Sequence, residues 1–107
     1  MADLSAAPAE VLEVHKAMVE NAIERFGGDD YQSLAPVYTR PEDRYNDETR
    51  EYELTGNWIV GCNYEGWGSS MVWKNGVWYY RPGYSEDRPM KNGHSEAVGN
   101  ASIFFTG

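Results

Sequence analysis

The sequence predicts an α+β fold, in which an N-terminal amphipathic helix and a short second helix pack on a four- to five-stranded antiparallel sheet. Three observations carry this prediction. Apolar residues recur at helical spacing near the N-terminus, an Asn-Gly pair lies between aromatic and β-branched residues in the second half, and helix-like segments precede strand-like ones. Because the chain has 107 residues, residues 1–107 are expected to form a single domain with its own core.

Residues 8–26 are predicted to form the long helix. Pro8 suits the first helical turn, and Gly27-Gly28 supplies the left-handed exit that often ends a helix. The apolar side chains of this segment recur every three or four residues and share one face: Val11, Leu12, Met18, Val19, Ala22, Ile23 and Phe26. That face is expected to pack on the sheet.

Two segments of different character follow. Residues 31–38 are predicted to form the second helix, which Asp29 or Asp30 would cap and Pro36 would limit to about two turns. Residues 41–50 are polar, charged and without periodicity, which is typical of an exposed loop.

Strand patterns begin at Glu51, where Tyr52 and Leu54 alternate with acidic residues, and an apolar run follows at residues 58–60. These residues predict two strands or one bent strand. Later in the chain, Asn92-Gly93 is a second candidate for a tight turn, and residues 101–105 are predicted to form a closing strand.

Residues 71–80 predict a β-hairpin with Asn75-Gly76 as its two-residue turn, because Asn and Gly readily adopt the positive φ angles that such turns need. The turn would pair Trp73 with Trp78, and alternation along the strands would place both tryptophans, Met71 and Tyr80 on one face. That face must either be buried or bind something.

The net charge of −8 is unevenly distributed. Residues 1–30 and 40–53 carry all of the excess acid, and the aromatic half from Leu54 onward is neutral. Direct binding to DNA or RNA needs clustered lysine and arginine, so this balance disfavours it, whereas it is compatible with a basic protein as the partner.

The chain is expected to work in the reducing cytoplasm. Cys62 is the only cysteine, and no charged and apolar segment resembling a secretory signal begins the sequence. No apolar run approaches the ~20 residues that span a bilayer, so no association with a membrane is expected.

After the first predicted helix, the residues Gly28-Asp29-Asp30, Leu34-Ala35 and Tyr38 give a pattern that resembles the opening of NTF2-like (cystatin-like cone) proteins. The resemblance covers residues 8–45. It implies a curved sheet that wraps a helix, frequent dimerisation through the sheet, and ligand binding or acid–base catalysis inside the cone. The likeness ends before the strands that would bear catalytic residues, so none is carried over.

Few residues suggest catalytic chemistry. His94 is the one catalytic candidate, as a general base paired with Glu96 or Asp87, although a single loop histidine is usually just solvated. His15 lies beside the apolar helix stripe and Cys62 in a strand pattern, so both are expected to be packed rather than reactive. Neither metal-ligand spacing nor a phosphate-binding loop is present, so no metal or cofactor is expected.

The aromatic residues between Trp58 and Tyr84 are too numerous for one face of a small sheet, which predicts that some are exposed for binding. The predicted binding residues are Trp67, Trp73, Trp78, Tyr80 and Tyr84, with Glu48 and Glu51 at an acidic rim. A packed core is the competing interpretation of the same aromatic residues.

Three functions remain open on the sequence. The leading hypothesis is a small protein-binding module, an inhibitor or an adaptor, whose partner is another protein or a second copy of the chain. The alternative is a cone-type protein that binds a small molecule or performs simple acid–base catalysis with His94. The third is an inhibitor that mimics nucleic acid, although three arginines inside the acidic segment oppose it.

Overall fold

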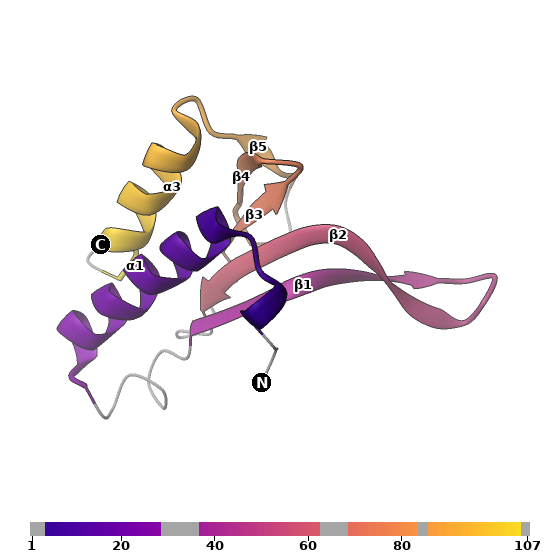
Figure 1. Ribbon diagram of the computed structural model, residues 1–107, viewed down its shortest axis with the longest axis horizontal. Helices are drawn as coiled ribbons and strands as arrows, with labels where there is room; N and C mark the ends of the chain where they lie inside the picture. Colours follow the sequence, from indigo (N-terminus) through magenta and orange to yellow (C-terminus); the bar gives the residue numbers. More distant parts are fainter. Residues whose placement is uncertain (1–3, 29–36, 63–68, 84–85, 106–107) are drawn as a thin grey trace.

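The computed structural model describes residues 4–28, 37–62, 69–83 and 86–105. A short 3₁₀ turn, η1 (Leu4–Ala6), precedes the long helix α1 (Ala9–Phe26), and the chain ends on a second helix, α3 (Gly93–Ser102). Between the helices run β1 (Val37–Asn46), β2 (Glu51–Cys62), β3 (Ser70–Lys74), β4 (Val77–Arg81) and β5 (Arg88–Pro89). The five strands pair in chain order, each antiparallel to the next, so the predicted α+β class is confirmed (Figure 1).

Helix α1 begins and ends where its sequence pattern predicts. The chain leaves it at Gly27, whose φ of 89° lies in the left-handed region and whose backbone N–H is donated to the carbonyl of Ile23. The buried face of the helix consists of Val11, Val14, Met18, Asn21 and Ala22. Leu12 and Ile23, which the sequence placed on the packed stripe, are exposed instead, because the sheet and α3 contact a stripe centred nearer Val14 and Met18.

The β3–β4 hairpin has the predicted register. Lys74 pairs with Val77, Trp73 with Trp78, Val72 with Tyr79 and Met71 with Tyr80. Asn75 (φ 50°) and Gly76 (φ 84°) occupy the left-handed region that a two-residue hairpin turn requires. Of the two alternatives for residues 51–60, the structure has one strand, β2, which pairs with β1 on one side and with part of β3 on the other.

Two predicted segments differ from the structure where it describes them. Residues 41–50 were expected to be a loop, but residues 41–46 belong to β1 and residues 47–50 form its turn into β2. Of the second helix predicted at residues 31–38, residues 31–36 lie outside the described part, while Val37 and Tyr38 begin β1. Residues 37–46 form a strand because β2 pairs with them and supplies their backbone hydrogen bonds. The strand therefore forms even though its sequence lacks regularly spaced apolar residues.

The C-terminal segment is helical where a tight turn and a closing strand were predicted. Asn92 caps α3 instead of joining two strands, and residues 101–105 finish the helix and its exit. The reason is tertiary packing: Ala97 and Ala101, one helical turn apart, are fully buried in the core, and their small side chains let α3 lie close against α1. Phe105 then folds back, and its backbone N–H donates to the buried Asn21 side chain at 2.8 Å.

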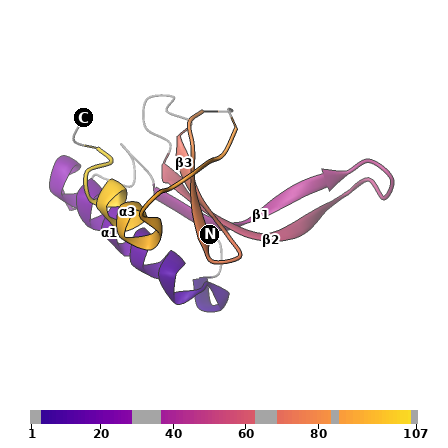
Figure 2. The same ribbon diagram turned by 90° about the horizontal axis from the view of Figure 1, so that it is seen from above.

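The core lies between the two helices and one face of the sheet. It contains Trp58, Val60 and Cys62 from β2, Met71 from β3 and Trp78 from β4, and α1 and α3 cover them. The far ends of β1 and β2 extend beyond these helices, which makes the molecule 44 Å long but only 31 by 28 Å across (Figure 1 and Figure 2). We call residues 43–54 of this extension the arm.

Candidate functional site

The arm is a two-stranded ribbon with its own turn chemistry. The side-chain oxygen of Asn46 accepts hydrogen bonds from the backbone N–H groups of Glu48, at 2.9 Å, and Thr49, at 3.4 Å. The backbone N–H of Arg50 donates a hydrogen bond to the backbone carbonyl of Asn46 at 2.7 Å. Arg50 adopts a φ of 60°, which closes the turn and redirects the chain into β2. A short polar segment thus reverses the chain with no help from the core.

One face of the arm is apolar and open to solvent. Tyr45 pairs with Tyr52 across the strands, and their rings meet edge to face with centroids 5.2 Å apart. Leu54 lies two residues beyond Tyr52 and therefore shares this face. Tyr52 is 70% exposed and Leu54 72%, while Tyr45, which packs on Tyr52, is 46% exposed.

The other face of the arm carries charge. Glu53 pairs with Arg44 in the register and accepts a hydrogen bond from the amide nitrogen of Asn46 at 3.0 Å, and Glu51 follows on the same face. Asp47 and Glu48 add two more carboxylates at the tip. A hollow of about 550 Å³ on the arm is lined by residues of both faces: Arg44, Tyr45, Asn46, Asp47, Glu48, Glu53, Leu54 and Thr55.

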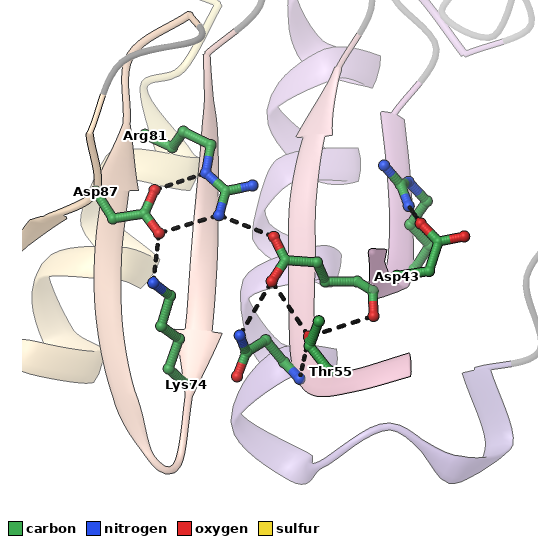
Figure 3. Close-up of polar contacts among 8 residues, drawn as sticks. Asp43, Thr55, Lys74, Arg81 and Asp87 are labelled. Atoms are coloured by element: carbon green, nitrogen blue, oxygen red, sulfur yellow. Dashed lines mark hydrogen bonds and ion pairs between the residues drawn. The ribbon is translucent and has the colours of Figure 1, made fainter. Parts of the chain in front are cut away.

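A network of polar side chains fixes the base of the arm to the outer face of the sheet (Figure 3). Arg81 of β4 donates to Glu42 at 2.9 Å and binds Asp87 through two nitrogens, at 2.6 and 3.0 Å. Lys74 joins Asp87 at 2.6 Å, and Asn57 and Thr55 donate to the other oxygen of Glu42 at 3.0 and 3.2 Å. Glu42 lies at the irregularity between Pro41 and Asp43, so the network holds β1 and β2 where the arm leaves the sheet.

The network keeps its acids ionised. Hydrogen bonds from Arg81, aided by Lys74, lower the pKa of Asp87 to about 2 despite its partial burial. Partial burial alone would raise the pKa of Glu42, but hydrogen bonds from Asn57, Arg81 and Thr55 outweigh it and hold that pKa below its usual value. The pKa of Arg81 is raised by the same pairing, chiefly by its hydrogen bonds with Asp87. These groups act as fixed charges and not as proton donors.

His94 lies in a different place from the one its sequence context suggested. Trp78 donates its indole N–H to Nδ1 of His94 at 3.2 Å, so Nδ1 must present its lone pair and Nε2 must carry the ring proton. The Nε2–H group of His94 donates a hydrogen bond to a carboxylate oxygen of Glu13 on α1, with the two heavy atoms 2.5 Å apart. Neither of the expected acids pairs with it: Asp87 binds Arg81, and Glu96 accepts the backbone N–H of Asn92.

The other two candidate groups have structural surroundings, as expected. His15 approaches the hydroxyl of Thr39 through Nδ1 at 2.7 Å and joins α1 to β1, and burial lowers its pKa. Cys62 is fully buried within the core cluster. Within residues 4–28, 37–62, 69–83 and 86–105, no three His, Cys, Asp or Glu side chains gather as metal ligands would.

The predicted binding residues divide between the core and the arm. Trp78 is fully buried beneath the helices, Tyr80 is half-buried against the core, and Trp73 is half-buried with its indole N–H donated to Glu10 of α1 at 3.1 Å. The hairpin face is thus covered by α1 and α3 and is not an open surface. Glu48 and Glu51 are exposed on the arm, while Trp67 and Tyr84 lie outside the described residues.

Sequence reasoning missed the exposed apolar residues of the arm as a site. Their signal was present, because Tyr45 and Tyr52 are placed symmetrically about a polar turn centred on residues 47–50, and Tyr52 and Leu54 alternate with glutamates. The charged residues and Pro41 concealed the first strand of the ribbon.

Comparison with known proteins found no matching family model, no similar curated protein and no similar solved structure. Among the helices of the described residues, none is long and apolar enough to cross a membrane.

Proposed function

We propose that the protein is a small protein-binding module, an inhibitor or an adaptor, that docks on another protein through its arm. The observation that carries this proposal is the exposure of Tyr45, Tyr52 and Leu54 together on one face of a ribbon that extends beyond the core. Single exposed apolar residues are ordinary, but three neighbours on a projecting hairpin form a patch. Tyrosine and leucine in such a patch lose little conformational entropy when a partner covers them.

The anchoring of the arm supports the same function. A two-stranded hairpin on its own is marginally stable in water, and a mobile one would have to be ordered on binding. The ion pairs from Arg81 to Glu42 and Asp87 hold the base of this hairpin to the sheet, which lowers that ordering cost. An arm that is held in place at its base is suited to recognition.

The two other functions have less support. A cone-type small-molecule protein or acid–base enzyme, as the resemblance to NTF2-like proteins implies, needs His94 as a base, but the indole N–H of Trp78 occupies the lone pair on Nδ1. A mimic of nucleic acid gains from a continuous row of unpaired carboxylates, and two carboxylates of the acidic segment are paired: Glu42 with Arg81, and Asp43 with Arg40 at 3.4 Å.

The test is retention of a partner from an extract of the source cell on the immobilised protein. The double variant Tyr52→Ser/Leu54→Ser should lose that partner while keeping the thermal unfolding curve of the wild type, since neither side chain is buried. Ile103→Ser is the matched control, because Ile103 is 63% exposed but lies at the end of α3. Retention of the same proteins by the double variant, or of none by the wild type, would count against the arm.

A further inference from the structure

We propose that the open edge of β2 in the arm binds an extended, basic segment of the partner as an additional β-strand, whose side chains alternate between apolar and basic. This inference rests on the proposed function, and it names where on the arm the partner binds and with what chemistry.

The first step is the unpaired edge. β2 pairs with β1 along most of its length, but it pairs with β3 only from Trp58 to Gly61. Among the described residues, no strand lies along the second side of residues 51–57. An edge of this kind presents backbone N–H and C=O groups that are ready to pair with another chain, and strand addition to such an edge is a recurring mode of peptide recognition.

The opposite edge of the ribbon is less suited to pairing. β1 is the first strand of the sheet, and its outer edge contains Pro41, which has no backbone N–H to donate. The irregularity between Pro41 and Asp43 interrupts that edge at the base of the arm, and the matching stretch between Leu54 and Trp58, with Gly56 at a φ of 91°, interrupts β2. Proline and bulges are devices that keep edge strands from pairing, and residues 51–54 of β2 contain neither.

The second step is the chemistry of the two faces. Tyr52 and Leu54 lie on one face of β2, and Glu51 and Glu53 lie on the other. Side chains on an added strand would alternate in the same way and meet these residues as cross-strand neighbours. Apolar side chains fit beside Tyr52 and Leu54, and cationic ones fit beside Glu51 and Glu53. The regular part of this edge, residues 51–54, faces about four residues of the partner strand.

The third step is charge, which selects a basic partner over a second copy of this chain. No lysine or arginine among the described residues forms an ion pair with Glu51 or Glu53. Glu53 accepts a hydrogen bond from Asn46 at 3.0 Å, but that amide carries no charge, so neither carboxylate is neutralised. Two copies joined at this edge would bring glutamates together in a molecule whose net charge is already −8. A basic strand instead places opposite charges across the new pair.

The experiment measures binding of fluorescein-labelled peptides to the full chain by fluorescence anisotropy. The probe is Lys-Val-Arg-Val-Lys-Val-Arg, and its control, Lys-Arg-Lys-Arg-Val-Val-Val, has the same composition in blocks. Two further probes carry backbone N-methyl groups, one on its valines and the other on its basic residues. The alternating peptide should bind at least about tenfold more tightly than the block peptide, and only one of the two methylated probes should still bind, because one set of N–H groups faces β2.

Matched variants test the charges. Glu51→Gln/Glu53→Gln should weaken binding of the probe by about tenfold, whereas Glu20→Gln/Glu24→Gln, which removes the same charge from the exposed side of α1, should leave it within about twofold. Equal binding of the alternating and block peptides, equal binding of the two methylated probes, or no effect of the arm variant would each overturn the strand proposal. If a partner from the extract still depends on Tyr52 and Leu54 while the probe fails to bind, the arm remains the docking surface and the edge of β2 does not.

Discussion

Trp78 and His94 set each other's hydrogen bonds, so His94 should contribute to stability. Replacing His94 by alanine would leave the indole N–H of a fully buried tryptophan without its acceptor. We expect His94→Ala to reduce the free energy of unfolding by about 2 kcal/mol, measured by urea denaturation with tryptophan fluorescence. Glu13→Gln is the control, since the Glu13 side chain is 64% exposed and its loss should cost less than about 1 kcal/mol. Unchanged stability of His94→Ala would restore the case for a chemical role.

The Arg81 network should make the protein sensitive to acid. The folded-state pKa values of Asp87, about 2, and of Glu42 are depressed, so these groups bind protons more weakly when the protein is folded. Their stabilising effect is present above the unfolded pKa, about 4 for a carboxyl, and is lost as the pH falls through the folded value. The free energy of unfolding should therefore decrease from about pH 5 toward pH 2.

Asp87→Asn tests this acid dependence, because the variant cannot gain or lose the proton concerned. Its free energy of unfolding should be lower than that of the wild type at pH 7 and should change less between pH 5 and pH 2. Asp47→Asn, in the exposed turn of the arm, should retain the wild-type slope. Parallel slopes for the wild type and Asp87→Asn would show that other acids control the response.

At the scale of the elements, two glycines should respond to alanine in opposite ways. A Cβ atom on Gly61 of β2 would lie 2.7 Å from the hydroxyl of Tyr38 and 3.0 Å from Cβ of Ser70, so the Tyr38 ring must move away from β2. Gly99 in α3 has nothing within 4 Å of the same position. We expect Gly61→Ala to destabilise the protein by about 1–2 kcal/mol and Gly99→Ala to stabilise it by about 0.5–1 kcal/mol, measured by chemical denaturation. Equal effects would contradict the close packing of Tyr38 on β2.

Elements with their own local chemistry could be predicted from the sequence. The long helix has apolar spacing, a proline at its start and a glycine at its end, and the β3–β4 hairpin has a turn that only a few residue pairs adopt. Helix α3 could not be predicted in this way, because the apolar residues at 101–105 are compatible both with a strand and with the last residues of a helix and the turn that follows it. Contact of Ala97 and Ala101 with α1 decides between them.

The candidate site was less predictable than the fold, because it depends on contacts between distant segments. The excess of aromatic residues was visible in the sequence, but which of them α1 and α3 would cover was not. Trp78 is therefore in the core, and the exposed aromatic residues are on the arm. Arg81 and Glu42 are 39 residues apart and meet only after the four strands from β1 to β4 have paired, so no local pattern indicates their ion pair.

At the scale of the whole molecule, the arm and the body should be separable. None of the residues of the core cluster lies between 43 and 56, and all four tryptophans lie outside that range. A variant in which Asn-Gly replaces residues 43–56 keeps Glu42 and Asn57 beside each other at the new turn, so that Arg81 and Asn57 can still bind Glu42. The shortened chain keeps every contact of the core cluster and loses, at Glu42, only the hydrogen bonds from Thr55, so the body should have little need of the arm for its stability.

This deletion should lower the free energy of unfolding by less than about 1 kcal/mol, because exposed residues contribute little, and it should retain the tryptophan emission of the wild type. Met18→Ala is the matched comparison, since removal of a fully buried side chain should cost about 2–5 kcal/mol in the same denaturation experiment. The deletion should also reduce the radius of gyration in X-ray scattering and abolish retention of the partner. Unfolding of the shortened chain would mean that the arm stabilises the body, and exposure of Tyr52 and Leu54 would then no longer be an argument for binding.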